Sequence, residues 1–269
     1  MNSFLKSTFL KIFRIFEVKK PNIMKNLAVF DFDHTIIDDN SDTAIMKLVN
    51  KSKYPPELKE LHKSEGWTCF MQGVFDVLHE NNITEADIAM LIKKLPEVEG
   101  IKSLITELHD NMDYDVIVIS DSNTFFIDMW LKANQLSGKV LKVFSNPAEF
   151  DENGRLSIKM YHNQDSCILS TRNLCKGMIL DDFIEQQNQR GIFYKKVVYI
   201  GDGHNDFCPI LRLNEKGVAC CREKYKCVDL VRRVRNGKKI SESDQTEYVV
   251  KADVCVWQNG QNILDFLRK

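Results

Sequence analysis

Short apolar runs alternate with helical patterns from residue 27 onward, and this alternation constrains the fold more than any other feature of the chain. Apolar runs that predict buried strands lie at residues 26–30, 115–120, 140–145, 195–200, 217–220 and 252–257. Amphipathic patterns such as GIKSLITELHDNM separate several of them. Strands that alternate with helices are typical of α/β proteins, because the crossover helices cover both faces of a parallel sheet. The sequence therefore predicts a doubly wound, mostly parallel sheet.

Residues 40–95 interrupt the alternation, since their patterns are helical and no convincing strand occurs among them. A helical insertion after the first strand would lie above the carboxyl ends of the strands, where open α/β sheets bind ligands. We therefore expect a small helical cap at 40–95 and a core formed by 26–39 and 96–269. Within the core range, residues 146–161 predict a β-hairpin with an Asn-Gly turn.

The first 25 residues differ in character from the rest of the chain. Residues 4–20 carry five basic side chains against a single glutamate, and Phe9, Phe13 and Phe16 recur at helical spacing. This pattern predicts an amphipathic basic helix within an extension of residues 1–25. Such a helix is suited to weak contact with a membrane surface or to mitochondrial targeting, but it is too interrupted by charge to span a bilayer. A dispensable extension or a packed helix is the alternative.

The composition is that of an ordinary globular protein, with 43% hydrophobic and 28% charged residues. The formal net charge of -1 creates no global field that would attract nucleic acid, so no nucleic-acid partner is expected. Eight cysteines are scattered along the chain without C-x-x-C spacing, and no cleavable secretory signal is expected. These features favour reduced thiols in the cytoplasm. A metal site formed by Cys167, Cys175 and Cys208 is the alternative.

Aspartates crowd the chain directly after the first predicted strand. Asp31 and Asp33 flank Phe32, and carboxylates this close raise each other's pKa unless a cation or a reaction needs them. An aspartate can attack phosphorus and form an acyl-phosphate. A second carboxyl group can protonate the leaving alkoxide and then deprotonate the attacking water. Asp31 is therefore a candidate nucleophile and Asp33 a candidate acid/base, whereas the alternative is that both acids are simply solvated.

Three further residues are of types that bind phosphate. Thr35 lies in the loop after Asp33, Ser120 ends the strand at 115–120, and Lys176 begins a helical pattern. A hydroxyl group can donate a hydrogen bond to a phosphoryl oxygen, and an ammonium group can neutralise its charge. Taken singly, Ser120 is more often a strand-end cap and Lys176 more often a solvated lysine.

The predicted strand at 195–200 leads into a G-D-G-x-N-D motif that contains Asp202 and Asp206. Its glycines let the backbone turn sharply, so that the carboxylates converge. Asp31 and Asp202, with the backbone carbonyl of Asp33 and water, would supply the oxygen ligands that an octahedral Mg²⁺ needs. Asp206 is expected as a further ligand or as support for the metal site.

The order of these motifs, D-x-D-x-T, a strand-end serine, a helix-start lysine and G-D-G-x-N-D, resembles the haloacid dehalogenase superfamily of phosphatases. The resemblance covers about residues 26–260. It implies that Asp31 is the nucleophile and Asp33 the acid/base, that Ser120 and Lys176 hold the phosphoryl group, and that Asp202 ligates Mg²⁺. It also implies a doubly wound sheet with a helical cap after the first motif.

Longer segments, among them VFDFDHTIIDDNSD, NLCK and YIGDGHNDFCP, are similar to the eukaryotic phosphoethanolamine/phosphocholine phosphatase family. That family includes relatives described as pyridoxal phosphate phosphatases. Residues 167–175 depart from its pattern, because relatives commonly have another cysteine and a proline there. The resemblance implies a small phosphomonoester as substrate, with phosphoethanolamine or phosphocholine favoured and pyridoxal 5′-phosphate as the alternative.

Asp42 and Asp121 lie beside these motifs but are not needed for phosphoryl transfer. One interpretation is that both acids attract an ammonium group of the substrate, with Trp67 or Phe70 as a cation–π wall. The same aromatic rings would also suit the flat ring of pyridoxal phosphate. The alternative for Asp42 is that it caps the first helix of the cap. A phosphomutase and a non-catalytic phosphometabolite-binding protein are rival functions, although the latter predicts the loss of a catalytic residue and none is lost.

Overall fold

The computed structural model describes residues 22–244 and 246–269, so the helix expected within residues 4–20 lies outside the described part. Six strands form one parallel sheet in the order β3-β2-β1-β6-β7-β8. They are β1 (Ile23–Phe30), β2 (Tyr114–Asn123), β3 (Lys142–Asn146), β6 (Ile192–Gly201), β7 (Val218–Arg222) and β8 (Asp253–Trp257). The doubly wound parallel sheet expected from the sequence is thereby confirmed, and β1 begins within the range 1–25 assigned to the extension.

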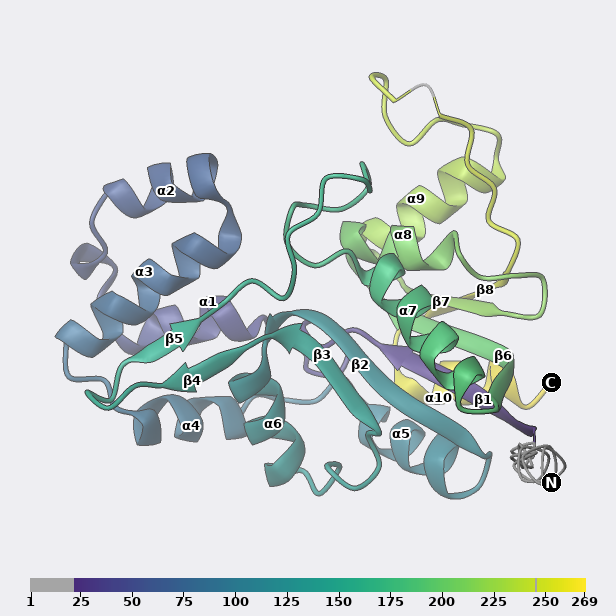
Figure 1. Cartoon of the computed structure of the whole chain (residues 1–269), viewed down its shortest axis with the longest axis horizontal. Coiled ribbons are helices and arrows are strands. Elements are labelled where there is room, and N and C mark those ends of the chain that lie inside the picture. The colour runs from purple at the N-terminus through teal and green to yellow at the C-terminus, as the bar shows by residue number, and fades with distance from the viewer. Residues whose placement is uncertain (1–21, 245) are drawn as a thin grey trace, which may run out of the picture.

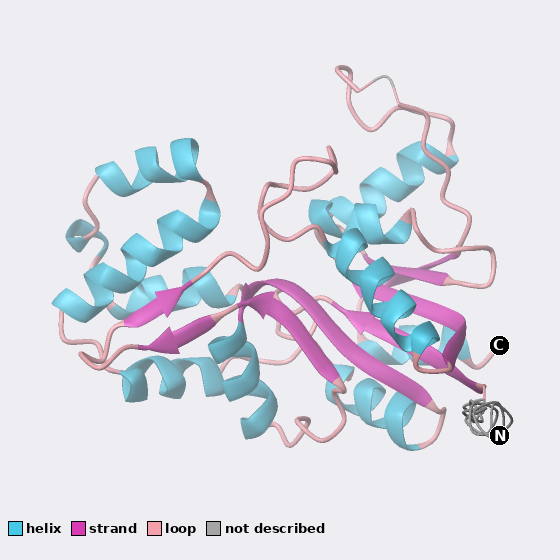
Figure 2. Cartoon of the chain, in the orientation of Figure 1, coloured by secondary structure: helices cyan, strands magenta, loops and turns pink. Residues whose placement is uncertain are grey.

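Helices cover both faces of this sheet (Figure 2). In β1, Ala28 and Phe30 belong to one hydrophobic cluster, whereas Leu27 and Val29 belong to the other. The first cluster includes α5 (Ile101–Asp110), α6 (Thr124–Ala133) and α10 (Gly260–Leu267), and the second includes α7 (Lys176–Gln189), α8 (Phe207–Ile210) and α9 (Lys226–Arg235). Successive side chains of a strand point to opposite faces, so a central strand with two buried faces must be apolar throughout.

A group of helices between β1 and α5 lies to one side of the sheet (Figure 1). It consists of α1 (Ser41–Ile45), α2 (Glu57–Glu65), α3 (Trp67–Glu80) and α4 (Glu85–Lys93), with short 3₁₀ turns η1 (Met46–Leu48) and η2 (Lys51–Lys53) after α1. Residues 41–93, all of which the structure describes, contain no strand. The helical insertion expected at 40–95 therefore has the expected secondary structure.

The predicted hairpin is present as β4 (Ala148–Phe150) and β5 (Leu156–Ile158), which pair antiparallel. Gly154 lies in the turn with φ of 77°, a left-handed conformation that glycine adopts without strain. The hairpin extends away from the sheet and lies beside α3 (Figure 1). There the Gln72 side chain accepts a hydrogen bond from Ile158 N at 2.9 Å and donates one to Leu156 O at 3.3 Å. Part of the range expected as core thus packs against the inserted helices.

None of the helices in the described residues is both long and apolar enough to cross a membrane.

Candidate active site

The carboxyl ends of three neighbouring strands bring the predicted catalytic residues to one edge of the sheet. Asp31 follows β1, Asp202 follows β6, and Ser120 lies near the end of β2. The backbone N–H of Asp31 donates to Ile200 O at 2.9 Å, which extends the pairing of β1 and β6 to this edge. All three side chains are buried. The sequence therefore folds so that residues from distant segments meet where parallel sheets present their ligand sites.

The turn after β1 fixes the side chain of Asp33. His34 adopts a left-handed backbone conformation with φ of 54°. The Asp33 carboxylate then accepts hydrogen bonds from the Ser41 backbone N–H at 2.8 Å and from Asn40 Nδ2 at 3.4 Å. The start of the inserted helices therefore holds the candidate acid/base in place. Asn40 is also the N-cap of α1, because its side chain accepts a hydrogen bond from Thr43 N at 2.8 Å.

Lys176 is the first residue of α7 and is completely buried. Its Nζ lies 2.8 Å from Asp31 Oδ2 and 2.8 Å from Asp206 Oδ1. A buried ammonium group persists only where carboxylates compensate the loss of hydration. Burial alone would lower the pKa of Lys176, but Asp206 and Asp31 outweigh burial and raise it above the usual value. Lys176 is therefore a permanent positive charge at the sheet edge.

Asp206 organises the carboxylate loop through four hydrogen bonds. Its Oδ2 accepts from the backbone N–H groups of Asp202 at 2.9 Å and Gly203 at 2.8 Å. Its Oδ1 accepts from Lys176 Nζ at 2.8 Å and from the Tyr199 hydroxyl at 2.7 Å. Tyr199 was not among the residues that the sequence singled out. An inward-facing tyrosine in β6 close before the loop is the only local signal of its role.

Two predicted phosphate-binding hydroxyls have partners within the protein. Thr35 Oγ1 donates to Asp202 Oδ1 at 3.1 Å, so Thr35 orients this carboxylate. Ser120 Oγ accepts from the Ser122 backbone N–H at 3.3 Å. The Ser122 hydroxyl in turn lies 2.9 Å from the Ser41 hydroxyl, which links the end of β2 to the first inserted helix. Both Thr35 and Ser120 are fully buried.

The residues present fit a divalent cation. Carboxylate oxygens of Asp31, Asp202 and Asp206 lie within 4.8 Å of one another. Lys176 contacts Asp31 and Asp206 and brings one positive charge to these three carboxylates, so negative charge remains for a cation to neutralise. Oxygen donors of this kind match the preference of Mg²⁺. Since four donors already occupy Asp206, Asp31 and Asp202 are the better candidates for ligands and Asp206 for support.

Burial shifts the pKa values of the candidate catalytic carboxyl groups upward. It raises the pKa of Asp31 well above the usual range, an effect that Lys176 opposes. It also raises the pKa of Asp33 well above the usual range, and the nearby Asp42 adds to this shift. For Asp202, burial and the neighbouring Asp206 raise the pKa to about 7. An upward shift of its pKa favours the protonated form of Asp33, the form that a general acid needs.

The structure places the two proposed head-group acids in different surroundings. Asp42 is 4% exposed, and its Oδ2 accepts a hydrogen bond from Trp67 Nε1 at 2.6 Å. Its Oδ1 is buried and has no hydrogen-bond partner. The interpretation of Asp42 as the cap of the first helix is wrong, because Asn40 occupies that position. Asp121 is exposed and accepts a hydrogen bond from Asn205 Nδ2 at 3.1 Å.

A cleft of about 400 Å³ lies between Asp121, which is next to this edge of the sheet, and the inserted helices. Its wall includes Asp121 beside Ser120, the segment 62–68, and residues 171–173 of the loop before α7. Trp67 in this wall is part of an aromatic cluster, with its ring centroid 5.0 Å from that of Phe70 and 5.2 Å from that of His62. The cleft thus has Asp121 near the sheet and the Trp67 ring on the side of the inserted helices, and Lys63, Glu65 and Arg172 add further charged groups to its lining.

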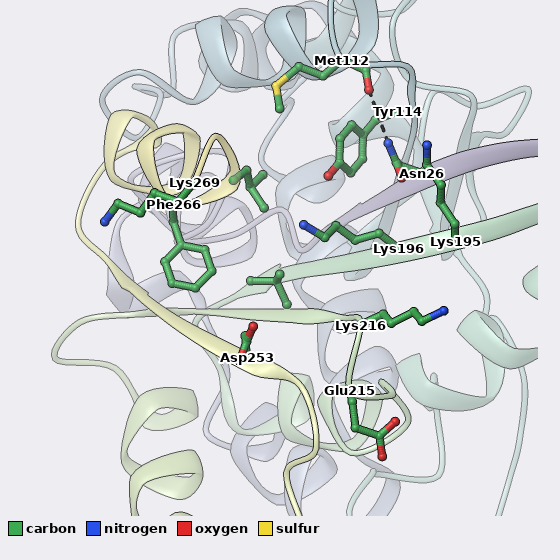
Figure 3. A pocket seen from close by; sticks show the side chains of 12 residues that line it. Asn26, Met112, Tyr114, Lys195, Lys196, Glu215, Lys216, Asp253, Phe266 and Lys269 are labelled. Carbon is green, nitrogen blue, oxygen red and sulfur yellow. Dashed lines mark hydrogen bonds between the residues drawn. The ribbon is translucent and has the colours of Figure 1, made fainter.

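A larger pocket of about 880 Å³ lies elsewhere (Figure 3). It is lined by residues such as Tyr114, Val218 and Asp253, which are the first residues of their strands. The candidate catalytic carboxylates are at the carboxyl ends of the strands, on the opposite edge of the sheet. This pocket therefore takes no part in the site formed by Asp31 and Lys176.

Comparison with known proteins identifies relatives of this arrangement. Residues 26–269 match the family described as "Putative Phosphatase". The chain is 39% identical over 246 residues to Pyridoxal phosphate phosphatase PHOSPHO2 of Mus musculus, which covers 91% of this chain and 98% of the relative. It is 29% identical over 238 residues to Phosphoethanolamine/phosphocholine phosphatase of Homo sapiens, covering 88% of this chain and 86% of that protein. A phosphoserine phosphatase solved as a phospho-aspartyl intermediate analogue shares the fold, with a TM-score of 0.51 and 17% identity over 90% of this chain and 99% of that one.

Proposed function

The chain belongs to this family of haloacid dehalogenase-type phosphatases, and from that premise we propose that it hydrolyses pyridoxal 5′-phosphate with Mg²⁺ as cofactor. The single observation that carries the mechanism is the buried contact of Lys176 Nζ with Asp31 at 2.8 Å, beside the buried Asp33 carboxyl group. It combines a nucleophile, a cation for the phosphoryl oxygens and an acid at one point.

In the first half of the proposed reaction, an Asp31 carboxylate oxygen attacks the phosphorus atom. A bond forms between this oxygen and phosphorus while the bond from phosphorus to the ester oxygen breaks. Asp33 gives its proton to the departing alkoxide, which leaves as an alcohol. Lys176 and the Ser120 hydroxyl are placed to donate hydrogen bonds to the phosphoryl oxygens, because both groups lie at the same sheet edge as Asp31.

In the second half, the Asp33 carboxylate takes a proton from a water molecule, whose oxygen attacks the phosphorus of the aspartyl-phosphate. The acyl-phosphate bond breaks, and inorganic phosphate and the free Asp31 carboxylate remain. When bound, Mg²⁺ would be held by Asp31, Asp202 and the backbone carbonyl of Asp33, and it would offset the negative charge of the phosphate. Asp206 keeps the Asp202 loop in position through its contacts with the backbone N–H groups.

Two observations support pyridoxal phosphate as the substrate. The chain shares more identity with the mouse pyridoxal phosphate phosphatase, 39%, than with the human phosphoethanolamine/phosphocholine phosphatase, 29%. The aromatic wall formed by Trp67 suits a planar ring, and Asp121 in the same cleft can accept a hydrogen bond from a protonated pyridine nitrogen. This substrate replaces the phosphoethanolamine or phosphocholine that the sequence favoured.

The test compares kcat/KM for pyridoxal 5′-phosphate, phosphoethanolamine and p-nitrophenyl phosphate in Mg²⁺. Pyridoxal phosphate should be the best of the three for the wild type. Trp67→Leu should lower kcat/KM for pyridoxal phosphate about 2- to 13-fold more than for phosphoethanolamine, since a stacked ring contributes about 0.5 to 1.5 kcal/mol. Trp67→Phe is the matched control, because it loses the contact with Asp42 but keeps a ring. A wild type that prefers phosphoethanolamine would contradict the substrate assignment.

Phosphoethanolamine and phosphocholine form a second candidate class, which the unpartnered Oδ1 of Asp42 favours. A buried carboxylate oxygen without a donor can attract a substrate ammonium group. If this candidate is right, Asp42→Asn lowers kcat/KM for the two ammonium esters by roughly 5- to 150-fold, or about 1 to 3 kcal/mol. Asp121→Asn should then act in the same direction. Equal losses on p-nitrophenyl phosphate would instead show that Asp42 supports the fold.

A further inference from the structure

Three cysteine sulfurs meet beside the amino end of α7, outside the carboxylate site. Cys208 Sγ lies 3.4 Å from Cys167 Sγ and 3.6 Å from Cys175 Sγ, and all three sulfurs are within 4.8 Å of one another. Tetrahedral zinc with bonds of about 2.3 Å spaces its sulfur ligands by about 3.8 Å. The three sulfurs, contributed by a loop, a helix start and a second helix, therefore already have the spacing of one metal's ligands.

The loop that carries Cys167 is built around the side chain of Gln164. Gln164 Oε1 accepts from the Cys167 backbone N–H at 2.8 Å, while its Nε2 donates to Thr171 O at 2.6 Å. The turn between these two contacts directs Cys167 toward Cys208. On the other side, Gly177 makes room for the cluster, because a Cβ atom there would lie 2.6 Å from Cys208 Sγ.

Two nearby features can stabilise the thiolates that metal binding requires, whereas the hydrogen bond with Cys175 and burial raise the pKa of the Cys208 thiol. Cys175 is the N-cap of the 14-residue helix α7, where the helix dipole stabilises negative charge. Arg212 Nη2 lies 3.9 Å from Cys208 Sγ and adds a positive charge. The Ser170 hydroxyl lies 3.5 Å from Cys167 Sγ, which places a fourth donor next to the three sulfurs.

We propose that Cys167, Cys175 and Cys208 bind a thiophilic divalent metal ion of the zinc class, with the Ser170 hydroxyl or water in the fourth position. Soft thiolate ligands select such ions, whereas the carboxylates of the catalytic site select Mg²⁺. The site would be structural. It joins the residue before Lys176 to α8, which begins directly after Asp206, and so fixes the distance between these two partners of the catalytic site.

The test uses full-length protein that is reduced and freed of metal. Titration with Co²⁺ should produce a thiolate-to-cobalt charge-transfer band in the near ultraviolet, which Zn²⁺ abolishes and excess Mg²⁺ leaves intact. Elemental analysis after Zn²⁺ loading and dialysis should find one zinc per chain. Because Co²⁺ bound by carboxylates gives no such band, the readout is independent of the catalytic site and of activity.

Variants of half-buried or loop residues keep the test clear of misfolding. Cys167→Ser should weaken Zn²⁺ binding by about tenfold or more, since one of three thiolates is lost. Ser170→Cys should tighten binding by about tenfold or more, because it supplies a fourth thiolate. Cys69→Ser is the matched control, as Cys69 is also half-buried but lies in α3.

Three outcomes would overturn the proposal. The first is the absence of a charge-transfer band in the reduced wild type. The second is a Zn²⁺ affinity of Cys167→Ser equal to that of Cys69→Ser. The third is a disulfide between Cys167 and Cys208 that forms under mild oxidation in a chain that binds no zinc when reduced, because the cluster would then be a redox pair.

Discussion

Replacing Asp206 by asparagine isolates the contribution of a buried carboxylate that does not touch the substrate. Both carboxylate oxygens accept two hydrogen bonds each, Oδ2 from backbone N–H groups and Oδ1 from Lys176 and Tyr199. An asparagine amide can accept on only one side. Backbone N–H groups cannot reverse, so the amide oxygen should face them and the NH₂ group should face Lys176.

The loss of stability follows from this geometry. The Tyr199 hydroxyl can rotate and accept from the new NH₂ group, but the ammonium group of Lys176 has no acceptor to offer. One charge-assisted hydrogen bond is therefore lost in a fully buried site, which costs about 1.5 to 3 kcal/mol. Lys176 keeps its contact with Asp31 at 2.8 Å, so the buried lysine retains one compensating carboxylate. We expect Asp206→Asn to lower the free energy of unfolding by about 1.5 to 3 kcal/mol.

Urea unfolding at neutral pH without divalent ions measures this loss, and the exposed pair of Lys132 with Asp128 provides the control. Asp128→Asn breaks a solvent-exposed aspartate–lysine pair and should cost less than about 1 kcal/mol. The Mg²⁺ concentration for half-maximal activity should also rise about tenfold or more in Asp206→Asn, since the loop of Asp202 loses part of its support. Equal stability losses in the two variants, with an unchanged Mg²⁺ requirement, would refute the reasoning.

Three further predictions concern the carboxylates. Asp31→Asn should abolish turnover while the protein stays folded by circular dichroism, and activity near that of the wild type would contradict the aspartyl-phosphate mechanism. EDTA should abolish the phosphatase activity, and added Mg²⁺ should restore it. Ca²⁺ should inhibit the enzyme because its bonds to oxygen ligands are longer than those of Mg²⁺. Full activity in metal-free enzyme would refute the metal requirement. Burial raises the pKa of Asp42 from 3.8 to about 7, so the folded state prefers the neutral form of this carboxyl group. The resulting stabilisation of the folded state is complete below pH 3.8 and is lost as the pH rises through 7. Asp42→Asn should therefore reduce the fall in unfolding free energy between pH 5 and pH 8 by about 2 to 3 kcal/mol, as measured by urea titration at each pH, and an unchanged fall would show that Asp42 does not titrate in this range.

The sheet could be predicted because its central strands are buried on both faces. Such strands appear in the sequence as continuous apolar runs, and all six runs became strands of the sheet. The hairpin was visible from its Asn-Gly turn. Its packing against α3 could not be predicted, because the contact of Gln72 with Ile158 joins residues 86 positions apart and no local pattern encodes it.

The candidate site at the carboxyl edge of the sheet was predictable where sequence motifs follow strands. It was less predictable where several side chains could fill the same position, such as the N-cap of α1. The sequence N-S-D offers three residues that can cap a helix, and Asp42 was one expectation. In the structure the Ser41 backbone N–H donates to Asp33, and Asn40 accepts from Thr43. The position of the cap is therefore set together with the orientation of Asp33. The role of Tyr199 likewise depends on where the loop of Asp206 folds back.

The hairpin that leans on α3 changes how the cap can move. A lid inserted at one place in a chain is joined to the core by two peptide connections and can rotate about them. Here the hairpin approaches from β3 and leaves toward α7, so two more connections cross from the sheet to the helices (Figure 1). Gln72 fastens them to α3. Opening the cleft must then bend the two connections of the inserted helices and the two connections of the hairpin together. This favours a small rotation of the inserted helices over a large one. The nearly constant width of the cleft entrance would then select, by size, the molecules that reach the aspartates.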